Sequence, residues 1–433
     1  MQVADSLAIP DTLERARAAG ELVVFAGAGV SMGPPASLPN FVELAREIAE
    51  PKLPWNPAYK KTLDVYLGRV EREDVDVQAR ARQILEVRGT HNPLHEHLLG
   101  IFGAAEQVRL ITTNFDPHFS SAAAQVFPGE LIPEFFGPAL PPGQDFRGVV
   151  QLHGSLVRRE SRLVLTDADF AEAYMAEGWA ARFLSRVFSR RTVLFVGYSL
   201  SDPIMRYLLH ALPSTDRWYA LWHRSEAGQG AEHRIHPVIF GKPKERDRYR
   251  DLNDGMKRWR WYATAAAIDH DKEIRRLVNS GPPSSPVDAD YLRARLNTDE
   301  GCRVFWDVAR GDRWFDWVAA ERLLDGLVDR SGGDRRAAAW GRWCLEHFCE
   351  GEIPPLLRYL RGRPLTLDPR FSKEVGLFLC TRKSLPPGPA LRQLLALVVG
   401  GASHMVGAAD EWEWLLERLI SEGLFDEALA LLR

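Results

Sequence analysis

Four short polar motifs each directly follow an apolar segment of the chain, and they hold the side chains best suited to chemistry. Glycine lets a backbone approach a phosphate closely, histidine is a candidate general base, and asparagine can position a water molecule without ionising. Ligands of open α/β sheets bind beyond the carboxyl ends of the strands, which is where these motifs stand. The motifs are Gly27–Ser31 (GAGVS), Thr112–Asp116 (TTNFD), Gln151–Gly154 (QLHG) and Gly197–Ser199 (GYS).

Each motif also has a structural explanation when it is taken alone. A glycine turn can be a tight strand-to-helix connection, and a histidine at a strand end is more often a hydrogen-bonded structural residue. Asp116 precedes a proline, which is typical of a helix N-cap. Met32 replaces the third glycine of GxGxxG, and no acidic strand end follows about twenty residues later, which disfavours a Rossmann dehydrogenase. Asn114 sits too early to be a cap, so the structural explanation fits it least.

Six apolar segments in the first 275 residues predict strands, and helical patterns separate them. Three of the segments, LVVFA, VVQL and TVLFV, are almost continuously apolar, as in strands buried on both faces of a parallel sheet. We therefore predict an α/β fold, with a Rossmann-like mostly parallel sheet and a helical subdomain, followed by an all-α C-terminal domain. The predicted strands are Leu22–Ala26, Arg109–Thr112, Val149–Leu152, Thr192–Val196, Arg217–Leu221 and Arg258–Tyr262.

The pattern along the chain divides it into two predicted domains. Residues 41–105 are helical in pattern and too long for one crossover, so we expect them to form a helical insertion in a catalytic domain of residues 1–279. A Gly-, Pro- and Ser-rich composition predicts a linker at 280–290. From 291 to 433 strand patterns disappear, and aromatic side chains such as Trp340 and Trp343 recur at helical spacing. We expect an α-helical sensor or assembly domain there.

Bulk composition excludes several classes of protein. The chain has 433 residues, 45% of them apolar and 26% charged, and a net charge of −3. These values exclude a mainly disordered or fibrous chain and disfavour direct nucleic-acid binding. We expect a cytoplasmic protein, because no signal peptide precedes the first strand and neither long uncharged stretch could form a membrane helix. The cysteines form no CxxC pair, so neither a disulfide framework nor a bound metal is expected; they are Cys302, Cys344, Cys349 and Cys380.

Two further clusters are best explained by structural roles. His91, His95 and His97 lie close together and could in principle bind a metal, but Asn92 and Pro93 among them look like the start of a helix. We expect these histidines to be structural. Lys242–Arg250 is a run of mixed charge, which is typical of a solvated face.

Taken in order, GAGVS, TTNFD, QLHG and GYSLSDP resemble the sirtuin-like family, and in particular its bacterial branch of NAD-cleaving defence effectors. The resemblance covers roughly residues 20 to 265 and includes Leu38–Phe41, which is similar to the family's IPDF segment. It implies that Asn114 and His153 are catalytic, acting at the nicotinamide ribose and on a ribose hydroxyl or water. The residues it assigns to NAD binding are Gly27, Ala28, Gly29, Ser31, Asn40, Phe41, Thr113, Asp116, Gly197 and Ser199.

The chain also departs from the family pattern. Protein-deacylating sirtuins carry a CxxC…CxxC zinc module after the catalytic histidine, whereas residues 153–275 contain no cysteine. Asn40 replaces the aspartate of IPDF, and Val42 stands where an arginine usually follows. These differences argue against an acyl-lysine substrate and favour water as the second substrate.

The resemblance implies an NAD hydrolase that releases nicotinamide and ADP-ribose, or cyclic ADP-ribose, and depletes NAD during phage infection. We expect a homo-oligomer that takes NAD as its substrate and is activated by a phage component or a partner defence protein. One alternative is a protein deacylase or ADP-ribosyltransferase. The other is a module that senses NAD without turning it over, against which the presence of both Asn114 and His153 weighs.

Overall fold

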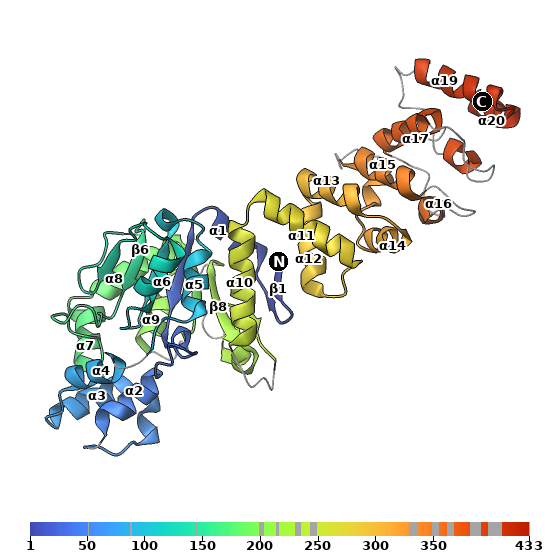
Figure 1. Cartoon of the computed structure of the whole chain (residues 1–433). Helices are drawn as coiled ribbons and strands as arrows, with labels where there is room; N and C mark the ends of the chain where they lie inside the picture. Colours follow the sequence, from blue (N-terminus) through green and yellow to red (C-terminus); the bar gives the residue numbers. More distant parts are fainter. Residues whose placement is uncertain are drawn as a thin grey trace. The chain divides into compact units, whose positions relative to one another are not determined.

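The structure of the protein is a computed structural model of the whole chain (Figure 1). It describes residues 1–50, 52–86, 89–143, 145–198, 203–213, 216–229, 235–242, 249–328, 336–348, 355–361, 368–381, 391–396 and 409–432.

A seven-stranded sheet in which all neighbours run parallel forms the centre of the N-terminal part. Its order is β5-β6-β4-β3-β7-β8-β9. The chain first forms β4, β5 and β6 on one side of β3, and then β7, β8 and β9 on its other side. Apart from the extra edge strand β5, this is the order of a doubly wound nucleotide-binding fold. The strands are β3 (Leu22–Ala26), β4 (Arg109–Thr112), β5 (Glu134–Phe136), β6 (Gly148–Gln151), β7 (Thr192–Val196), β8 (Trp218–His223) and β9 (His236–Phe240).

Helices cover both faces of this sheet, as the predicted fold class requires. Alternate residues of each strand face opposite layers, so Val24 contributes to one apolar core and Phe25 to the other. The core around Val24 includes α1 (Asp11–Ala18), α5 (Pro93–Gly100), α6 (His118–Val126) and α10 (Arg250–Thr264). The core around Phe25 includes α7 (Asp167–Ala171), the π-helical turn η4 (Glu172–Ala176), α8 (Trp179–Arg190) and α9 (Pro203–Ala211). Every residue of β3, β6 and β7 is buried, which confirms the prediction from their almost continuous apolar runs, and every residue of β4 is buried as well.

Three helices between β3 and β4 form a separate small core beside the sheet. They are α2 (Phe41–Ala49), α3 (Leu63–Arg72) and α4 (Val77–Glu86), and Leu44, Tyr66 and Leu67 are buried among them. The next helix, α5, belongs to the layer on the sheet instead, because Leu94, Leu98 and Leu99 pack into the core around Val24. The region predicted as a helical insertion is therefore helical, but its last helix is part of the main body.

One predicted strand is wrong. Arg258–Tyr262 (RWRWY) lies inside α10, where Leu252, Met256 and Trp259 are buried at the spacing of a helix face. Alternation of Arg and Trp over five residues mimicked the two-residue period of a strand, but the apolar period of the longer window is helical. The prediction missed β5, β9 and a short hairpin of β1 (Gln2–Ala4) and β2 (Leu7–Ala8), all of which are short or carry polar or proline residues.

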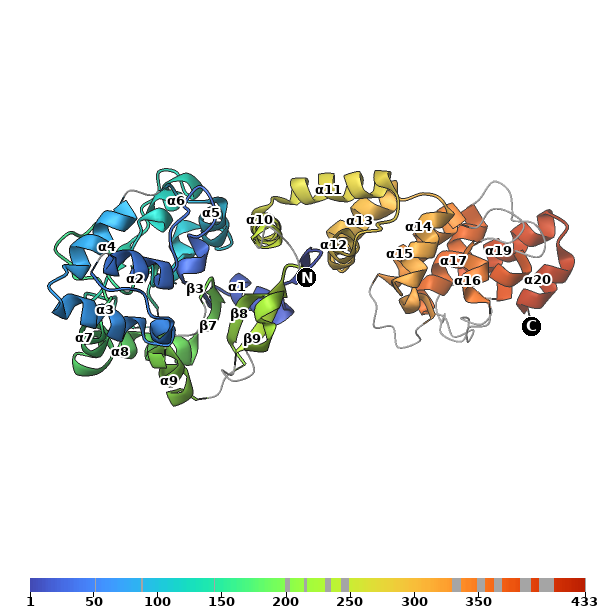
Figure 2. The same cartoon turned by 90° about the horizontal axis from the view of Figure 1, so that it is seen from below.

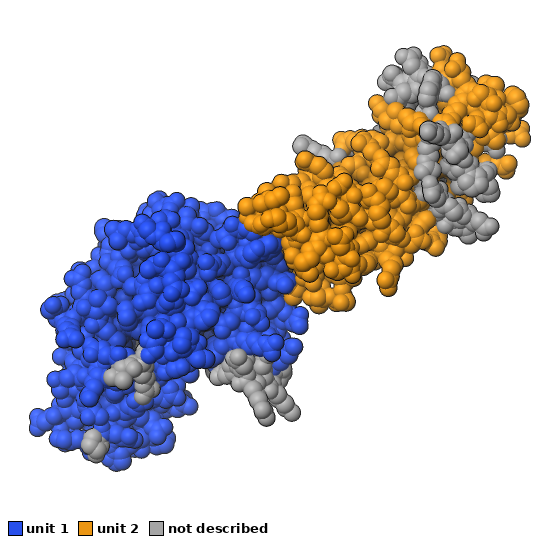
Figure 3. Space-filling view, in the orientation of Figure 1, with its two compact units in different colours: residues 1–265 blue, residues 266–433 orange. Residues whose placement is uncertain are grey.

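The chain divides into two compact units, Met1–Ala265 and Ala266–Arg433 (Figure 3). Of the linker expected at 280–290, residues 281–285 lie between two helices of the second unit, α11 (Ala267–Ser280) and α12 (Pro286–Leu296), and the remaining residues belong to these helices. All elements described in this unit are helical. They also include α13 (Asp299–Val308), α14 (Asp312–Ala320), the 3-10 helix η6 (Asp325–Val328), α15 (Ala337–Phe348), α16 (Pro355–Leu360), α17 (Pro369–Thr381), α19 (Ala409–Ser421) and α20 (Phe425–Leu432).

The helices of the second unit stack in a regular way (Figure 2). One row consists of α11, α13, α15, α17 and α19, in which α11 packs on α13, α15 on α17 and α17 on α19. Three further helices, α12, α16 and α20, each pack against a member of this row. Members of the row begin roughly 30 to 40 residues apart, as in solenoids built from helix pairs. The buried side chains of Trp340, Trp343 and Cys344 confirm the apolar stripe predicted for this region. None of the helices within the described ranges has both the length and the apolar character needed to cross a bilayer.

Candidate active site

The four motifs meet at one edge of the sheet. β3, β4, β6 and β7 are parallel neighbours, so their carboxyl ends, and the motifs that follow them, share this edge. The strand order reverses between β3 and β7, which places Gly27–Ser31 and Gly197 at the switch point where ligands of such sheets bind. Ser199 and Asp202 lie outside the described residues.

The glycines of the first motif serve a close contact between two loops. The amide of Gly29 donates to the carbonyl oxygen of Gly197 at 2.9 Å, and the amide of Gly27 donates to Val196 at the same distance. A Cβ on Gly27 would lie 2.7 Å from the carbonyl oxygen of Gly197, and one on Gly29 would lie 2.7 Å from its Cα. Side chains at these positions would push the two loops apart, so packing alone accounts for both glycines.

The turn differs from the phosphate-binding helix start that the sequence suggested. It is a 3-10 turn of three residues, η1 (Ala28–Val30), and the next α-helix begins only at Phe41. A helix dipole therefore does not act at the turn. The amides of Val30 and Ser31 donate to Gly27 and Ala28, whereas the amide of Ala28 has no hydrogen-bond partner among the described residues. That amide is the donor that the turn can offer to an anion.

Ser31 is the centre of a buried cluster of polar side chains. Its hydroxyl accepts from Nδ2 of Asn114 at 3.0 Å and donates to Oδ2 of Asp116 at 3.1 Å. Nε2 of His95 lies 3.1 Å from the same oxygen. All four side chains are at most 7% exposed. The structure thus brings Ser31, Asn114 and Asp116, which the sequence analysis selected, into direct contact, and adds His95.

His95 reaches Ser31 because Asn92 fixes the start of α5. Oδ1 of Asn92 accepts from the amide of Leu94 and lies 2.8 Å from Nδ1 of His95. Nδ2 of Asn92 donates to the carbonyl oxygens of Val30 and Gly33, at 2.8 and 3.2 Å. Asn92 therefore joins the glycine turn to α5. The sequence indicated a helix start here, but no local signal connects His95 to Ser31, which is 64 residues away.

Burial shifts the pKa values of the ionisable groups in this cluster toward the uncharged form of each group. It raises the pKa of Asp116 and lowers the pKa of its neighbour His118. It also lowers the pKa of His95 to about 3, an effect to which the nearby His118 contributes. A low-dielectric site disfavours charge, so burial acts against the charged forms of the groups around Asn114 and Ser31.

His153 belongs to a separate aromatic cluster. It follows β6, and the chain turns immediately after it at Gly154, whose φ of +93° suits glycine. Nε2 of His153 lies 2.8 Å from the hydroxyl of Tyr174, and the ring packs edge-on against Phe170. Burial lowers the pKa of His153 to about 3. A general base works best with a pKa near the operating pH, so in this conformation His153 is a hydrogen-bonding group and a weak base.

The other predicted ligand residues have clear structural roles. Asn40 caps α2, with its Oδ1 accepting from the amide of Glu43 at 3.0 Å. Phe41 begins that helix and packs against its small core. The amide of Thr113 donates to the carbonyl oxygen of Ala26 at 3.1 Å. Helix α6 begins at His118, one residue later than Asp116-Pro117 predicted, and Asp116 accepts from the amide of His118.

A cavity of about 770 Å³ borders Asp116, and its walls also include Pro35, Leu85, His91 and His118. Among the described residues that line the cavity there is no lysine or arginine. Among the described residues, no group of three or more His, Cys, Asp or Glu side chains is arranged to hold a metal ion. His91 lies 3.4 Å from Glu96 and His95 contacts Ser31, while burial lowers the pKa of His97 to about 4.

An open parallel sheet with a glycine turn at its switch point is the architecture of nucleotide-binding α/β proteins. Residues 108–235 of the chain match the model of the SIR2-like domain. The matched range contains Asn114 and His153, while Gly27–Ser31 precede it. The match supports a sirtuin-like family and NAD-related activity.

A search of curated proteins finds similarity to an uncharacterized protein, y4cA, of Sinorhizobium fredii (strain NBRC 101917 / NGR234). The two chains are 29% identical over 387 residues, which cover 77% of this chain and 30% of the relative. The chain therefore spans less than a third of the length of that relative.

Proposed function

We propose that the protein is an NAD glycohydrolase, which cleaves NAD to nicotinamide and ADP-ribose or its cyclic form. The observation that carries the proposal is the position of Asn114: its amide is held on Ser31 at the carboxyl edge of the sheet, beside the switch point. The pyrophosphate would lie at the glycine turn, where the amide of Ala28 can donate to it, and the nicotinamide ribose would lie toward Asn114.

The reaction breaks the bond between the ribose C1′ and the pyridinium nitrogen, and the departing base keeps the electron pair. The ribose then carries oxocarbenium character, so the site must hold an oxygen nucleophile without adding positive charge near the ring. Asn114 and a neutral His153 can both orient a water or a ribose hydroxyl by hydrogen bonds. Attack by water gives ADP-ribose and releases one proton, while attack from within ADP-ribose gives the cyclic product.

The rival functions use the same edge of the sheet differently. A deacylase or ADP-ribosyltransferase would need room for an acylated or modified second substrate, and the segment after His153, which would border it, folds back as α7 and η4 to place Tyr174 on the histidine. A sensing module would bind NAD and leave it intact. The wider role that we propose is a cytoplasmic, oligomeric defence effector, switched on by a phage component or a partner protein.

Incubation of the protein with NAD, alone and with an extract of phage-infected cells as the source of an activator, followed by chromatography, tests the proposal. We expect nicotinamide and ADP-ribose, linear or cyclic, to appear in equal amounts. Asn114→Ala should abolish this release, while Asn297→Ala, which changes an exposed asparagine at the end of α12, should leave it unchanged. Binding of NAD without release of nicotinamide would identify a sensing module. Removal of acyl groups from lysine peptides would identify a deacylase.

A further inference from the structure

The hydroxyl of Tyr174 is hydrogen-bonded to a ring nitrogen of His153, the histidine that the proposed reaction needs. Its hydroxyl lies 2.8 Å from Nε2 of His153, and its ring stacks on Phe170 at 6.0 Å between centroids. Phe170 in turn packs edge-on against His153 at 5.4 Å. All three side chains are buried. The imidazole is therefore held by one hydrogen bond and by two aromatic neighbours.

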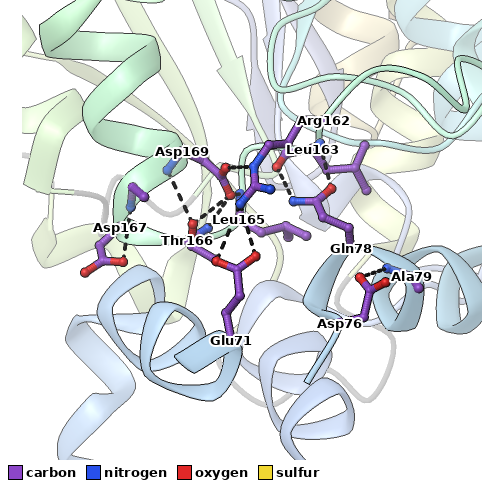
Figure 4. A network of polar contacts seen from close by, with 11 residues as sticks. Glu71, Asp76, Gln78, Ala79, Arg162, Leu163, Leu165, Thr166, Asp167 and Asp169 are labelled. Atoms are coloured by element: carbon purple, nitrogen blue, oxygen red, sulfur yellow. Dashed lines mark hydrogen bonds and ion pairs between the residues drawn. The ribbon is translucent and has the colours of Figure 1, made fainter. Parts of the chain in front are cut away.

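A network of hydrogen bonds and ion pairs fixes the segment that delivers Tyr174 (Figure 4). The carboxylate of Asp169 accepts from the amides of Leu165 and Thr166, at 3.1 and 2.9 Å, and forms an ion pair with Arg162. Arg162 reaches Glu71 of α3 at 3.1 Å. These contacts tie the start of α7 to the small helical core, so the following turn is held in place.

A second pair of bonds supports the same segment. Gln78 of α4 donates from Nε2 to the carbonyl oxygen of Leu163 and accepts from its amide, both at 2.9 Å (Figure 4). Tyr174 itself stands in the π-helical turn η4, which follows α7 directly. Single π-helical turns are rare and are frequent at functional sites. The chain thus uses an uncommon turn, anchored on two sides, to bring one phenol onto His153.

The chemistry of the pair sets the position of the imidazole proton. A neutral imidazole has one N–H and one lone pair, and the hydrogen bond made by one ring nitrogen determines the role of the other. A phenol hydroxyl is a good donor, and an imidazole lone pair is a better acceptor than a phenol oxygen. We propose that Tyr174 is a positioning residue: its hydroxyl donates to Nε2 of His153, which leaves the proton on Nδ1 and presents Nδ1–H to the substrate.

His153 would then orient an oxygen of the ribose or of the attacking water by donating a hydrogen bond to it, and would remove no proton in the bond-breaking step. Its low pKa agrees with this role, because the ring stays neutral at the pH of the cell. The part of the inference that concerns catalysis rests on the proposed function. The inferred position of the imidazole proton does not depend on the proposed function.

Tyr174→Phe tests the inference, because it removes one hydroxyl and keeps the aromatic stack. In the wild-type protein labelled with ¹⁵N-histidine, two-bond ¹H–¹⁵N spectra should show His153 protonated at Nδ1. The variant should shift toward protonation at Nε2. In NAD cleavage, kcat should fall by roughly tenfold or more with KM little changed, since an orienting contact of the transition state is weakened. Tyr207→Phe changes a tyrosine that is 69% exposed and should alter neither readout.

An unchanged proton position in Tyr174→Phe overturns the inference, whatever the activity. A shifted proton with wild-type kcat overturns the positioning role, and a variant faster than wild type would show that Tyr174 restrains the enzyme instead. If the wild-type protein does not cleave NAD, the proposed function fails, and the spectra alone decide what Tyr174 does. Should Tyr174→Phe not fold, Arg162→Gln removes the half-exposed ion pair of the anchor and should give a smaller shift in the same direction. No shift in that variant would overturn the inference.

Discussion

Gly29 and Gly197 pack backbone against backbone at the point where the sheet reverses its strand order. The amide of Gly29 lies 2.9 Å from the carbonyl oxygen of Gly197, and a Cβ on Gly197 would lie 2.5 Å from the amide nitrogen of Val30. Gly197 also has a φ of +62°, in the left-handed region. The two loops that would hold the pyrophosphate and ribose of NAD are thus held together by their own main chains.

Gly197→Ala should therefore destabilise the fold. Overpacking and left-handed strain together cost roughly 2–4 kcal/mol in the free energy of unfolding, which chemical denaturation can measure. Gly33→Ala is the matched control in the neighbouring loop, because its Cβ would meet nothing closer than Nδ2 of Asn92 at 3.7 Å. Equal stabilities of the two variants would contradict the close packing of the loops.

Ser31→Ala should weaken both the fold and the activity. It leaves Nδ2 of Asn114 and a carboxyl oxygen of Asp116 without their buried partner, at a cost of about 1–3 kcal/mol. Because Asn114 would lose the contact that holds its amide, NAD cleavage should fall more than stability alone explains. Ser189→Ala removes an exposed hydroxyl on α8 and should change neither. A Ser31→Ala protein with full activity would show that the cluster is only structural.

Stability should fall as the pH drops below the ordinary histidine range. His95 and His153 have pKa values of about 3 in the folded protein, against 6.5 for ordinary histidine. The unfolded chain takes up protons at these positions as the pH falls from 6.5, while the folded chain does not until about 3. The free energy of unfolding should therefore be largest above pH 6.5 and decrease by up to about 1.4 kcal/mol per pH unit for each histidine.

Denaturation at several pH values, with His153→Asn as the variant, measures this slope. The variant should show a shallower dependence between pH 6.5 and 4 than the wild type. A variant slope equal to that of the wild type would mean that His153 is not buried as a neutral base.

Trp259 and Trp261 separate the helical from the strand interpretation of RWRWY. On a strand both rings would face the same side, whereas on α10 Trp259 is fully buried and donates from Nε1 to Glu14 at 2.6 Å, and Trp261 is half-buried. Trp259→Ala should cost about 3–5 kcal/mol of unfolding free energy. Trp261→Ala should cost well under half of that, and similar losses in calorimetry would argue against the helix.

The strands that position the candidate site could be predicted because their signal is local. Leu22–Ala26 is apolar throughout, Thr192–Val196 is apolar after its first residue, and Arg109–Thr112 has an apolar centre; polar or glycine residues follow each of them, and the structure has all three with these bounds. Parallel strands buried on both faces must be apolar in this way, and their carboxyl ends must share an edge. RWRWY was wrongly predicted as a strand, because five residues are too few to distinguish a two-residue period from one face of a helix.

By itself, the sequence determined which residues stand at the carboxyl edge of the sheet, because strand ends and glycine turns depend on only a few consecutive residues. Only the tertiary structure decided how those residues are paired and charged. Asn114 and Asp116 meet Ser31 across 83 and 85 residues, and Tyr174 reaches His153 through an anchored π-helical turn. The pKa of His153 is likewise a property of burial, because a histidine at a strand end is basic in water and weakly basic only when folding removes the water around it.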